Sequence, residues 1–169
     1  MDQRQAHRRY FDSHAADYDA HTADGAWTPN QYLAGVLRTL AAQDVEVRTA
    51  LDLGTGTGQT LEVVRAAFPQ ARLWASDLSP AMLRHAALKA PDAHFEVADI
   101  SSHVTGLTES FDLVTAVGCL EMVEDLMTVL PRLMPHLNPG GQLRSSHLFT
   151  AYHRAGAPVL YELLLIGKG

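Results

Sequence analysis

The residues that most plainly suggest chemistry are three glycines, Gly54, Gly56 and Gly58, which follow a short apolar run at alternate positions. Glycine at every second residue lets the backbone turn sharply and approach a ligand with no Cβ in the way. The helix expected after this loop points its N-terminal N–H groups back toward it, where they favour a negatively charged group. A tight strand-to-helix turn without a ligand is the alternative. Three glycines within five residues, directly after an apolar strand, favour a ligand-binding loop.

The spacing of the glycines narrows the kind of ligand. A dinucleotide-binding loop has the pattern G-x-G-x-x-G, whose third glycine allows helix and strand to pack closely. Here the third glycine is Gly58, the next residue is Gln59, and no Lys-Ser or Lys-Thr follows as in a phosphate-binding P-loop. With Asp52 before it, the loop resembles the first motif of the class I S-adenosylmethionine (SAM)-dependent methyltransferases, an acid followed by three alternate glycines.

Asp77 is the candidate for binding a ribose. It lies nineteen residues after Gly58, close to the spacing of about 20 at which such loops place the acid for the ribose hydroxyls. A carboxylate can accept hydrogen bonds from both hydroxyls of a cis-diol. The alternative is a helix cap, but Ser79 and Pro80 already supply a cap for the helix that follows. We therefore predict a ligand-binding role for Asp77.

The resemblance to the methyltransferases implies further cofactor contacts. It places Asp99 at the adenine amino group with the backbone N–H of Ile100 beside it, although Asp99 could equally cap the turn at Ser101. Leu78 and Met82 would flank the adenine. The cofactor implied is SAM, with S-adenosylhomocysteine (SAH) as its product, and no metal is expected. The expected cofactor-binding residues are Tyr18, Asp52, Gly54, Thr55, Gly56, Gly58, Asp77, Leu78, Met82, Asp99, Ile100 and Gly118.

Tyr18 enters this set through the N-terminal segment. Residues 2–20 are polar and rich in alanine, and the resemblance implies a segment that folds over the cofactor, with Tyr18 of the Tyr18-Asp19 pair at the methionine end. We predict that residues 10–21 form this lid. The residues spaced to share one helical face are Tyr10, Phe11, Ala15 and Tyr18, a pattern that simple core packing would also produce.

Three histidines in the same segment, His7, His14 and His21, recur every seven residues. Seven-residue steps along a helix leave them about two turns apart, whereas the ligands of a metal must converge on one ion. We therefore interpret these histidines as solvated or partner-facing residues.

Methyl transfer from a sulfonium is an in-line displacement of an activated donor, so positioning alone can supply much of the acceleration. A base would help if the acceptor is a hydroxyl or an ammonium. The candidates near the carboxyl ends of the fourth and fifth expected strands are Glu121, His147 and His153, and a buried structural role suits His147 equally well. The family often has Leu-Glu-His after the fourth strand, and Met122 stands in place of that histidine. No catalytic residue is assigned.

Length and composition limit the possible classes. At 169 residues, with 47% apolar and 19% charged residues, the chain is expected to form one domain, 1–169, with a sizeable core. A net charge of −6 without a basic cluster argues against nucleic acid and favours a cationic or neutral small molecule as the acceptor. No signal peptide or membrane-spanning run is evident, so no membrane partner is expected. The single Cys119 excludes an internal disulfide and favours the cytoplasm.

The positioning elements are expected to alternate between strands and helices. Helices are expected over 29–42, 58–67 and 80–90, and two short helices over 124–137, because Pro131 and Pro135 interrupt that segment. Strands that each end in a small or acidic residue before a helix indicate an α/β fold, a doubly wound, mostly parallel Rossmann-like sheet with its ligand beyond the strands' carboxyl ends. The expected strands are 48–53, 72–76, 94–98, 111–118 and, after a turn over 137–142 that resembles the family's Leu-x-Pro-Gly-Gly, 143–149.

The tail departs from the family pattern. These methyltransferases normally add a helix, a sixth strand and an antiparallel seventh strand, but only twenty residues follow Phe149. We expect a shortened C-terminus in which strand 159–166 pairs antiparallel with 143–149; a short helix is the alternative. Such an edge strand recruits partners, so a homodimer through it is expected. The expected division is a lid and packing helix over 1–42, a cofactor-binding core over 48–150 and a hairpin strand over 151–169.

Three functions from different classes remain open. SAM-dependent methyl transfer to a small molecule is the prediction. A SAM- or SAH-binding subunit or sensor without catalysis is the first alternative, motivated by the shortened tail and the lack of a clear base. A nicotinamide-dependent oxidoreductase is the second, and Gln59 together with the missing second nucleotide-binding half counts against it.

Overall fold

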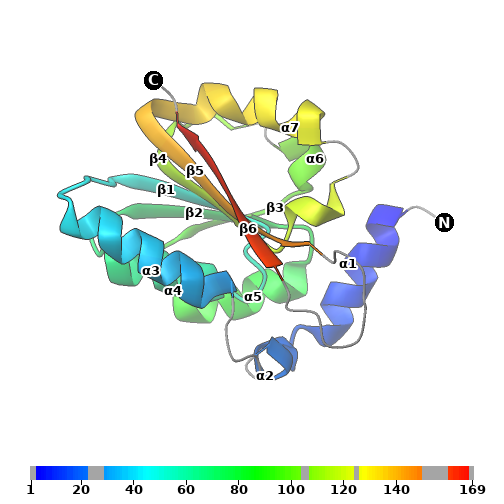
Figure 1. Ribbon diagram of the computed structural model, residues 1–169. Helices are drawn as coiled ribbons and strands as arrows, with labels where there is room; N and C mark the ends of the chain where they lie inside the picture. Colours follow the sequence, from blue (N-terminus) through cyan, green and yellow to red (C-terminus); the bar gives the residue numbers. More distant parts are fainter. Residues whose placement is uncertain (1–2, 23–28, 104–106, 124–125, 150–159, 168–169) are drawn as a thin grey trace.

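A six-stranded sheet forms the middle of the molecule, which we describe from a computed structural model (Figure 1). The strand order is β3-β2-β1-β4-β5-β6; β1 to β5 run parallel, and β6 runs antiparallel to β5. The structure describes residues 3–22, 29–103, 107–123, 126–149 and 160–167. The expected doubly wound, mostly parallel sheet is confirmed. The strands are β1 Thr49–Leu53, β2 Arg72–Asp77, β3 His94–Val97, β4 Phe111–Val117, β5 Leu137–Phe149 and β6 Leu160–Gly167.

Strands β1 and β4 lie side by side at the centre of the sheet. Every residue of β1 is buried, and in β4 only Asp112 and Val117 are partly exposed. Their near-continuous apolar sequences explain this burial, because a parallel strand with helices on both faces has no solvent side. The chain moves outward from β1 to β3 and returns to β4 on the other side of β1. The strand order therefore reverses between β1 and β4, the point at which open α/β sheets bind ligands.

Helices cover both faces of this sheet (Figure 1). On one face, Leu37 and Val64 pack with Leu73 of β2 in a buried apolar cluster. On the other face, Leu133 packs with Leu51 of β1 in a second cluster. The first face carries α3 Pro29–Ala42, α4 Gln59–Ala67 and α5 Pro80–Lys89, and the second carries α6 Ile100–His103 and α7 Leu126–Leu133; the 3₁₀ turns η1 Leu120–Met122 and η2 Met134–His136 flank α7.

The N-terminal segment forms two helices, α1 Gln3–His14 and α2 Tyr18–Thr22, where the apolar spacing suggested one helical face over 2–20. A turn separates them, in which the N–H of Asp17 donates to the carbonyl of His14 at 3.2 Å. Helix α1 packs against α5. In Figure 1 both N-terminal helices lie at the end of the sheet where the parallel strands finish.

Two short helices occupy 126–136, as expected, but the first does not end at Pro131, which lies inside α7. The helix starts at Leu126, and the first residue able to donate an intrahelical bond is the fourth after it. Pro131 is the next residue, so it removes only one bond near the N-terminal end. The α-helix ends at Leu133, and Pro135 lies in the 3₁₀ turn that follows.

Strand β5 begins at Leu137, six residues before the expected start, because the glycine turn is built into the strand as an irregularity. Phe111 of β4 pairs with Leu137 and Leu113 with Gln142, so the intervening residues of β5 bulge out of register. Gly140 within this bulge has a φ of +76°, a value that glycine adopts without strain.

Strand β6 occupies one edge of the sheet. Leu143 of β5 pairs with Ile166 and Phe149 pairs with Leu160, so the pairing extends along most of β6. The expected connection over 150–158 lies outside the described residues. The side chains of 160–166 are not described either, and β6 is defined by its backbone pairing with β5.

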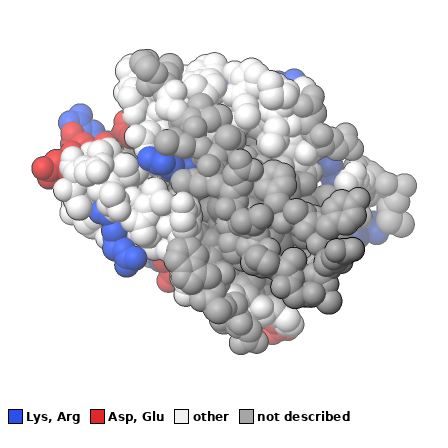
Figure 2. All heavy atoms as spheres, viewed as in Figure 1, with Lys and Arg blue, Asp and Glu red and all other residues white. Residues whose placement is uncertain are grey.

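The surface drawn in Figure 2 carries scattered charges, and acidic and basic side chains are adjacent at its left edge. Two close ion pairs illustrate the mixing of signs, Arg48 with Glu46 at 2.7 Å and Arg65 with Asp92 at 2.6 Å. Within the described ranges, none of the helices combines the length and the apolar character needed to cross a membrane.

Asp52 is a buried carboxyl in the central strand β1, only 2% exposed. Its Oδ1 accepts a hydrogen bond from the hydroxyl of Thr115 at 2.7 Å, whereas its Oδ2 has no hydrogen-bond partner among the described residues. Burial raises the pKa of Asp52 to about 7 and outweighs the opposing effect of the Thr55 and Thr115 hydroxyls. The folded protein therefore favours the protonated, neutral carboxyl.

This burial predicts how stability depends on pH. Because the pKa of Asp52 is raised on folding, its stabilising effect is present below pH 3.8 and is lost as the pH rises through about 7. Asp52→Asn cannot ionise, so between pH 5 and pH 8 the parent chain should lose on the order of 2 kcal/mol more unfolding free energy than the variant. Urea unfolding at several pH values measures the difference, because every other titratable group is common to the two proteins. Parallel curves for the two proteins would contradict a buried, neutral Asp52.

Candidate functional site

A cavity opens at the carboxyl ends of β1, β2, β3 and β4, under the N-terminal helices. The empty space within it, open solvent at its mouth included, is about 830 Å3. The cavity lies where the strand order reverses. It is lined by Arg4, His7, Phe11, Tyr18, Gly54, Gly56, Asp77, Leu78, Met82, Ala98, Asp99, Ile100, Ser101, Val117, Gly118, Cys119 and Met122.

The structure brings together all but three of the residues expected to bind the cofactor. Asp52, Thr55 and Gly58 do not line the cavity; Asp52 is buried in β1, and Thr55 and Gly58 are buried within the glycine loop itself. The others come from the ends of four strands and from α2 and α5, far apart in sequence. They share the cavity wall because parallel strands end at the same edge of the sheet. The residues on the wall are Tyr18, Gly54, Gly56, Asp77, Leu78, Met82, Asp99, Ile100 and Gly118.

The three loop glycines, all with positive φ, have different physical roles. A Cβ on Gly54 would lie 2.4 Å from the Cβ of Cys119, and a Cβ on Gly58 would lie 2.9 Å from the Cα of Ala86. These two glycines are therefore required by packing within the protein. A Cβ on Gly56 would meet no atom within 4 Å, and Gly56 lines the cavity. The open space beside Gly56 is the space available to a ligand.

The carboxylate of Asp77 joins the glycine loop to the start of α5. Its Oδ2 accepts a hydrogen bond from the N–H of Gly56, and its Oδ1 accepts one from the N–H of Ser79, each at 2.8 Å. Burial raises the pKa of Asp77, and the bonds from Ser79 and Gly56 offset part of that effect. A carboxylate has about four acceptor positions, so Asp77 can also accept hydrogen bonds from the hydroxyls of a ligand. The separate N-cap of α5 is Ser79, whose Oγ accepts from the N–H of Met82 at 3.1 Å.

Asp99 caps the turn at Ser101, one of the two roles that its sequence context suggested, and it also lines the cavity. Its Oδ1 accepts a hydrogen bond from the N–H of Ser101 at 2.8 Å, as a cap at the start of α6 does. Its Oδ2 lies 2.6 Å from Nε of Arg4 on α1, and both residues line the cavity. Asp99 therefore also links the N-terminal helix to the end of β3.

Apolar contacts and hydrogen bonds hold helix α1 over the cavity. Phe11 and Tyr18 pack beside Met82 in a small apolar cluster. The carboxylate of Asp12 accepts a hydrogen bond from the hydroxyl of Ser79 at 2.6 Å, and the bond from Ser79 leads the contacts that lower the pKa of Asp12. The same residue that caps α5 thus also holds α1.

The three N-terminal histidines differ in their surroundings. His7 lines the cavity, because α1 turns this face inward. His14 and His21 remain exposed, and each ring Nδ1 contacts a backbone carbonyl of its own segment, that of Tyr10 at 2.7 Å and that of Asp17 at 2.8 Å. The described part of the chain holds no cluster of three His, Cys, Asp or Glu side chains suited to a metal ion.

Several lining residues were missed from the sequence. Ala98, Ser101 and Cys119 are sequence neighbours of the expected ligands and could have been inferred from that position alone. Arg4 and His7 give a weaker signal, since they share a helical face with Phe11. That spacing predicts a helix face turned toward the rest of the protein. It does not distinguish a face that packs on the core from one that lines a cavity. Val117 and Met122 complete the set of missed residues.

The three weak catalytic candidates are not tested by the structure. Glu121 lies in η1 and His147 in β5, but their side chains are not described. His153 lies outside the described residues. The described geometry therefore concerns binding and positioning.

The chain is similar to known methyltransferases. It is 36% identical over 113 residues to the trans-aconitate 2-methyltransferase of Variovorax paradoxus, a match that covers 63% of this chain and 43% of the relative. It is also 36% identical over 126 residues to the trans-aconitate 2-methyltransferase of Deinococcus radiodurans, covering 69% of this chain and 47% of the relative. The matched part thus spans less than half the length of these curated relatives.

A solved structure shows the same fold. The N-methyltransferase NodS from Bradyrhizobium japonicum, crystallised in complex with SAH, superposes with a TM-score of 0.66 at 21% identity, over 82% of this chain and 71% of that chain. Residues 51–143, more than half of the chain, match the sequence model of the family described as a methyltransferase domain. These residues run from the central strand through the glycine loop to β5 and include most of the cavity wall. The chain therefore belongs to the methyltransferase domain family.

Proposed function

We propose that this chain binds SAM in the cavity and transfers its methyl group to a small-molecule acceptor. The observation that carries the proposal is the open face of Gly56 beside the carboxylate of Asp77, at the reversal point of the sheet of a methyltransferase-family chain. SAH in the complex of the similar NodS methyltransferase supports the choice of cofactor. The residues we propose for cofactor binding are those of the cavity wall, with Asp52, Thr55 and Gly58 supporting the conformation of the loop.

The chemistry of the wall fits the parts of this cofactor. The carboxylate of Asp77 suits the hydroxyls of a ribose, and Leu78 and Met82 on the same wall offer apolar surface to an adenine ring. Asp99 and Ile100 lie on this wall as well and suit the polar edge of the adenine. Tyr18 on α2 is proposed for the methionine end.

When bound, SAM supplies a methyl group that its sulfonium charge has already activated. The residues of the chain then need only bind the two reactants, orient them and exclude water. Residues 1–42 are proposed to cover the site and pack on the sheet, 48–150 to form the cofactor-binding core, and 151–169 to complete the sheet edge. A base remains unassigned.

The names of the relatives suggest an acceptor. Because the matched relatives are trans-aconitate 2-methyltransferases, we propose a small carboxylic acid of this kind as the acceptor. A carboxylate is ionised at neutral pH, so it needs no base to become a nucleophile. This agrees with a site whose described residues are arranged for binding.

A homodimer through the edge strand β6 is the remaining part of the proposal. One side of β6 pairs with β5, and β6 ends the strand order. The N–H and C=O groups on the outer side of an edge strand are available for pairing with another chain.

The cofactor site predicts that a methyl group on Gly56 will weaken SAH binding. Gly56→Ala should lower the affinity for SAH about tenfold or more, because the added Cβ occupies ligand space. The matched control is Gly140→Ala, since Gly140 also has positive φ and open space around its Cβ but lies in β5 away from the cavity. Both variants carry a similar backbone strain of about 1–2 kcal/mol, so only the site effect differs. Titration calorimetry with SAH, and with NAD as the competing ligand, measures it; equal SAH affinities for the two variants would refute the site.

Turnover separates a methyltransferase from a cofactor-binding protein without activity. With labelled SAM, we expect the label to pass to trans-aconitate or to another member of a panel of small carboxylic acids, with SAH formed in equal amount. The Gly140→Ala variant should retain this activity and Gly56→Ala should lose most of it at low SAM. SAM binding without acceptor-dependent SAH formation across the panel would favour the non-catalytic alternative.

The dimer is tested by light scattering over a concentration series. A homodimer should give twice the chain mass of 18.4 kDa at high concentration and approach the single mass on dilution. A mass of one chain at every concentration would exclude it.

A further inference from the structure

We propose that Asp19 is a positioning residue of the cofactor site, whose carboxylate holds α2 on the glycine loop and so keeps Tyr18 at the cavity wall. The inference rests on the proposed function, because the site it positions is the proposed SAM site. Asp19 itself does not line the cavity, whereas its neighbour Tyr18 does. Asp19 therefore acts through other residues.

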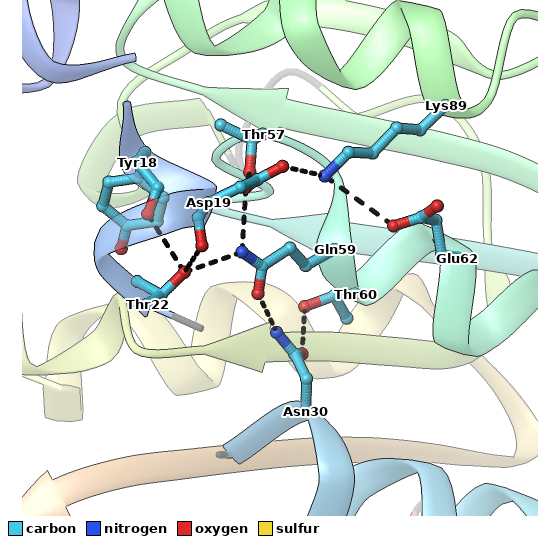
Figure 3. Close-up of polar contacts among 9 residues, drawn as sticks. All are labelled: Tyr18, Asp19, Thr22, Asn30, Thr57, Gln59, Thr60, Glu62 and Lys89. Atoms are coloured by element: carbon cyan, nitrogen blue, oxygen red, sulfur yellow. Dashed lines mark hydrogen bonds and ion pairs between the residues drawn. The ribbon is translucent and has the colours of Figure 1, made fainter. Parts of the chain in front are cut away.

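Three donors from three different elements converge on the carboxylate of Asp19 (Figure 3). The hydroxyl of Thr57 in the glycine loop donates to Oδ1. The Nε2 of Gln59, the first residue of α4, donates to the same oxygen at 2.8 Å. The Nζ of Lys89, the last residue of α5, donates to Oδ2 at 2.6 Å. A single side chain of α2 thus contacts the loop and both helices behind it.

Gln59 extends this contact from α2 to α3 (Figure 3). Its Nε2 also donates to the hydroxyl of Thr22 at 2.9 Å, and its Oε1 accepts from Nδ2 of Asn30 at 3.1 Å. The hydroxyl of Thr60 in turn donates to Oδ1 of Asn30 at 2.9 Å. In a dinucleotide-binding loop a glycine would stand at position 59. Here Gln59 stands at this position, and its side-chain amide links α2 and α3 to the loop.

The glycine loop is consequently held between two carboxylates. On the cavity side, the N–H of Gly56 donates to Asp77. On the side of α2, the hydroxyl of the next residue, Thr57, donates to Asp19, and Thr57 is 2% exposed. Because Gly56 and Thr57 are adjacent, a displacement of α2 acts directly on the part of the loop that faces the ligand.

The charge of Asp19 is compensated at this position. Burial alone would raise the pKa of Asp19, but the bonds from Lys89, Thr57 and Gln59 together hold it below its usual value. The carboxylate is therefore ionised at neutral pH and accepts all three hydrogen bonds. The Nζ of Lys89 also lies 3.7 Å from Oε2 of Glu62, so this ammonium group forms ion pairs with the carboxylates of both Asp19 and Glu62.

The experiment compares Asp19→Asn with Asp92→Asn by calorimetry with SAH. Asp92 forms an ion pair with Arg65 at the same 2.6 Å distance, but neither residue lines the cofactor cavity. Asp19→Asn replaces a charged acceptor of three donors, so we expect SAH affinity to fall about tenfold. Asp92→Asn should change the affinity less than about twofold, with melting temperatures of the two variants alike.

A double variant distinguishes positioning from general stabilisation. If Asp19 acts by holding Tyr18, then Asp19→Asn should weaken SAH binding far less in a Tyr18→Ala background than in the parent chain. Hydrogen exchange adds a second measurement, in which SAH should slow exchange over residues 10–22 in the parent chain and not in Asp19→Asn. Should Asp19→Asn fail to fold, Thr57→Val removes one of the three donors with little change of shape and should lower SAH affinity about threefold.

The outcomes separate this inference from the proposed function. If the parent chain does not bind SAH, the proposed site is wrong and the inference falls with it. If the parent chain binds SAH but Asp19→Asn binds it equally well, only the positioning role of Asp19 is refuted. Additive losses for Tyr18→Ala and Asp19→Asn, or an equal loss for Asp92→Asn, would also refute it.

Discussion

The rest of the site depends on one carboxylate, that of Asp77, which accepts the N–H of Gly56 with one oxygen and the N–H of Ser79 with the other. These two bonds fix the glycine loop that follows β1 relative to the helix that follows β2. The loop must also approach its neighbours closely, since Gly54 and Gly58 leave no space for a Cβ. With these contacts in place, the loop is open beside Gly56, and the cavity lies there.

The N-terminal helices use the same anchor points as the cavity itself. Ser79 donates its hydroxyl to Asp12 of α1, and Thr57 donates its hydroxyl to Asp19 of α2. Arg4 of α1 pairs with Asp99 at the end of β3. Helices α1 and α2 are therefore bonded to the same loop and strand ends that form the cavity. Ligand binding is expected to depend on how these two helices are held.

Much of the fold follows from local sequence signals. The strand and helix positions are readable because apolar runs bounded by glycine, proline and acidic residues specify them, and Ser79 with Pro80 marks the start of α5 as expected. The two errors in the elements have different causes, one non-local and one local. The 137–142 turn was incorporated into β5 because β4 pairs on both sides of it. Pro131 was tolerated because it falls at a point of α7 where it removes a single bond.

The sequence by itself determined the class of fold, the glycine loop and the acidic residues at the strand ends, because spacing along the chain encodes them. Only the tertiary structure decided which of these residues reach the cavity. It buried Asp52 in β1 and placed His7 on the cavity wall, and it assigned Asp19 three donors from distant elements. Such contacts depend on how helices dock on the sheet, and docking is fixed by packing between segments far apart in the chain, which no local pattern records.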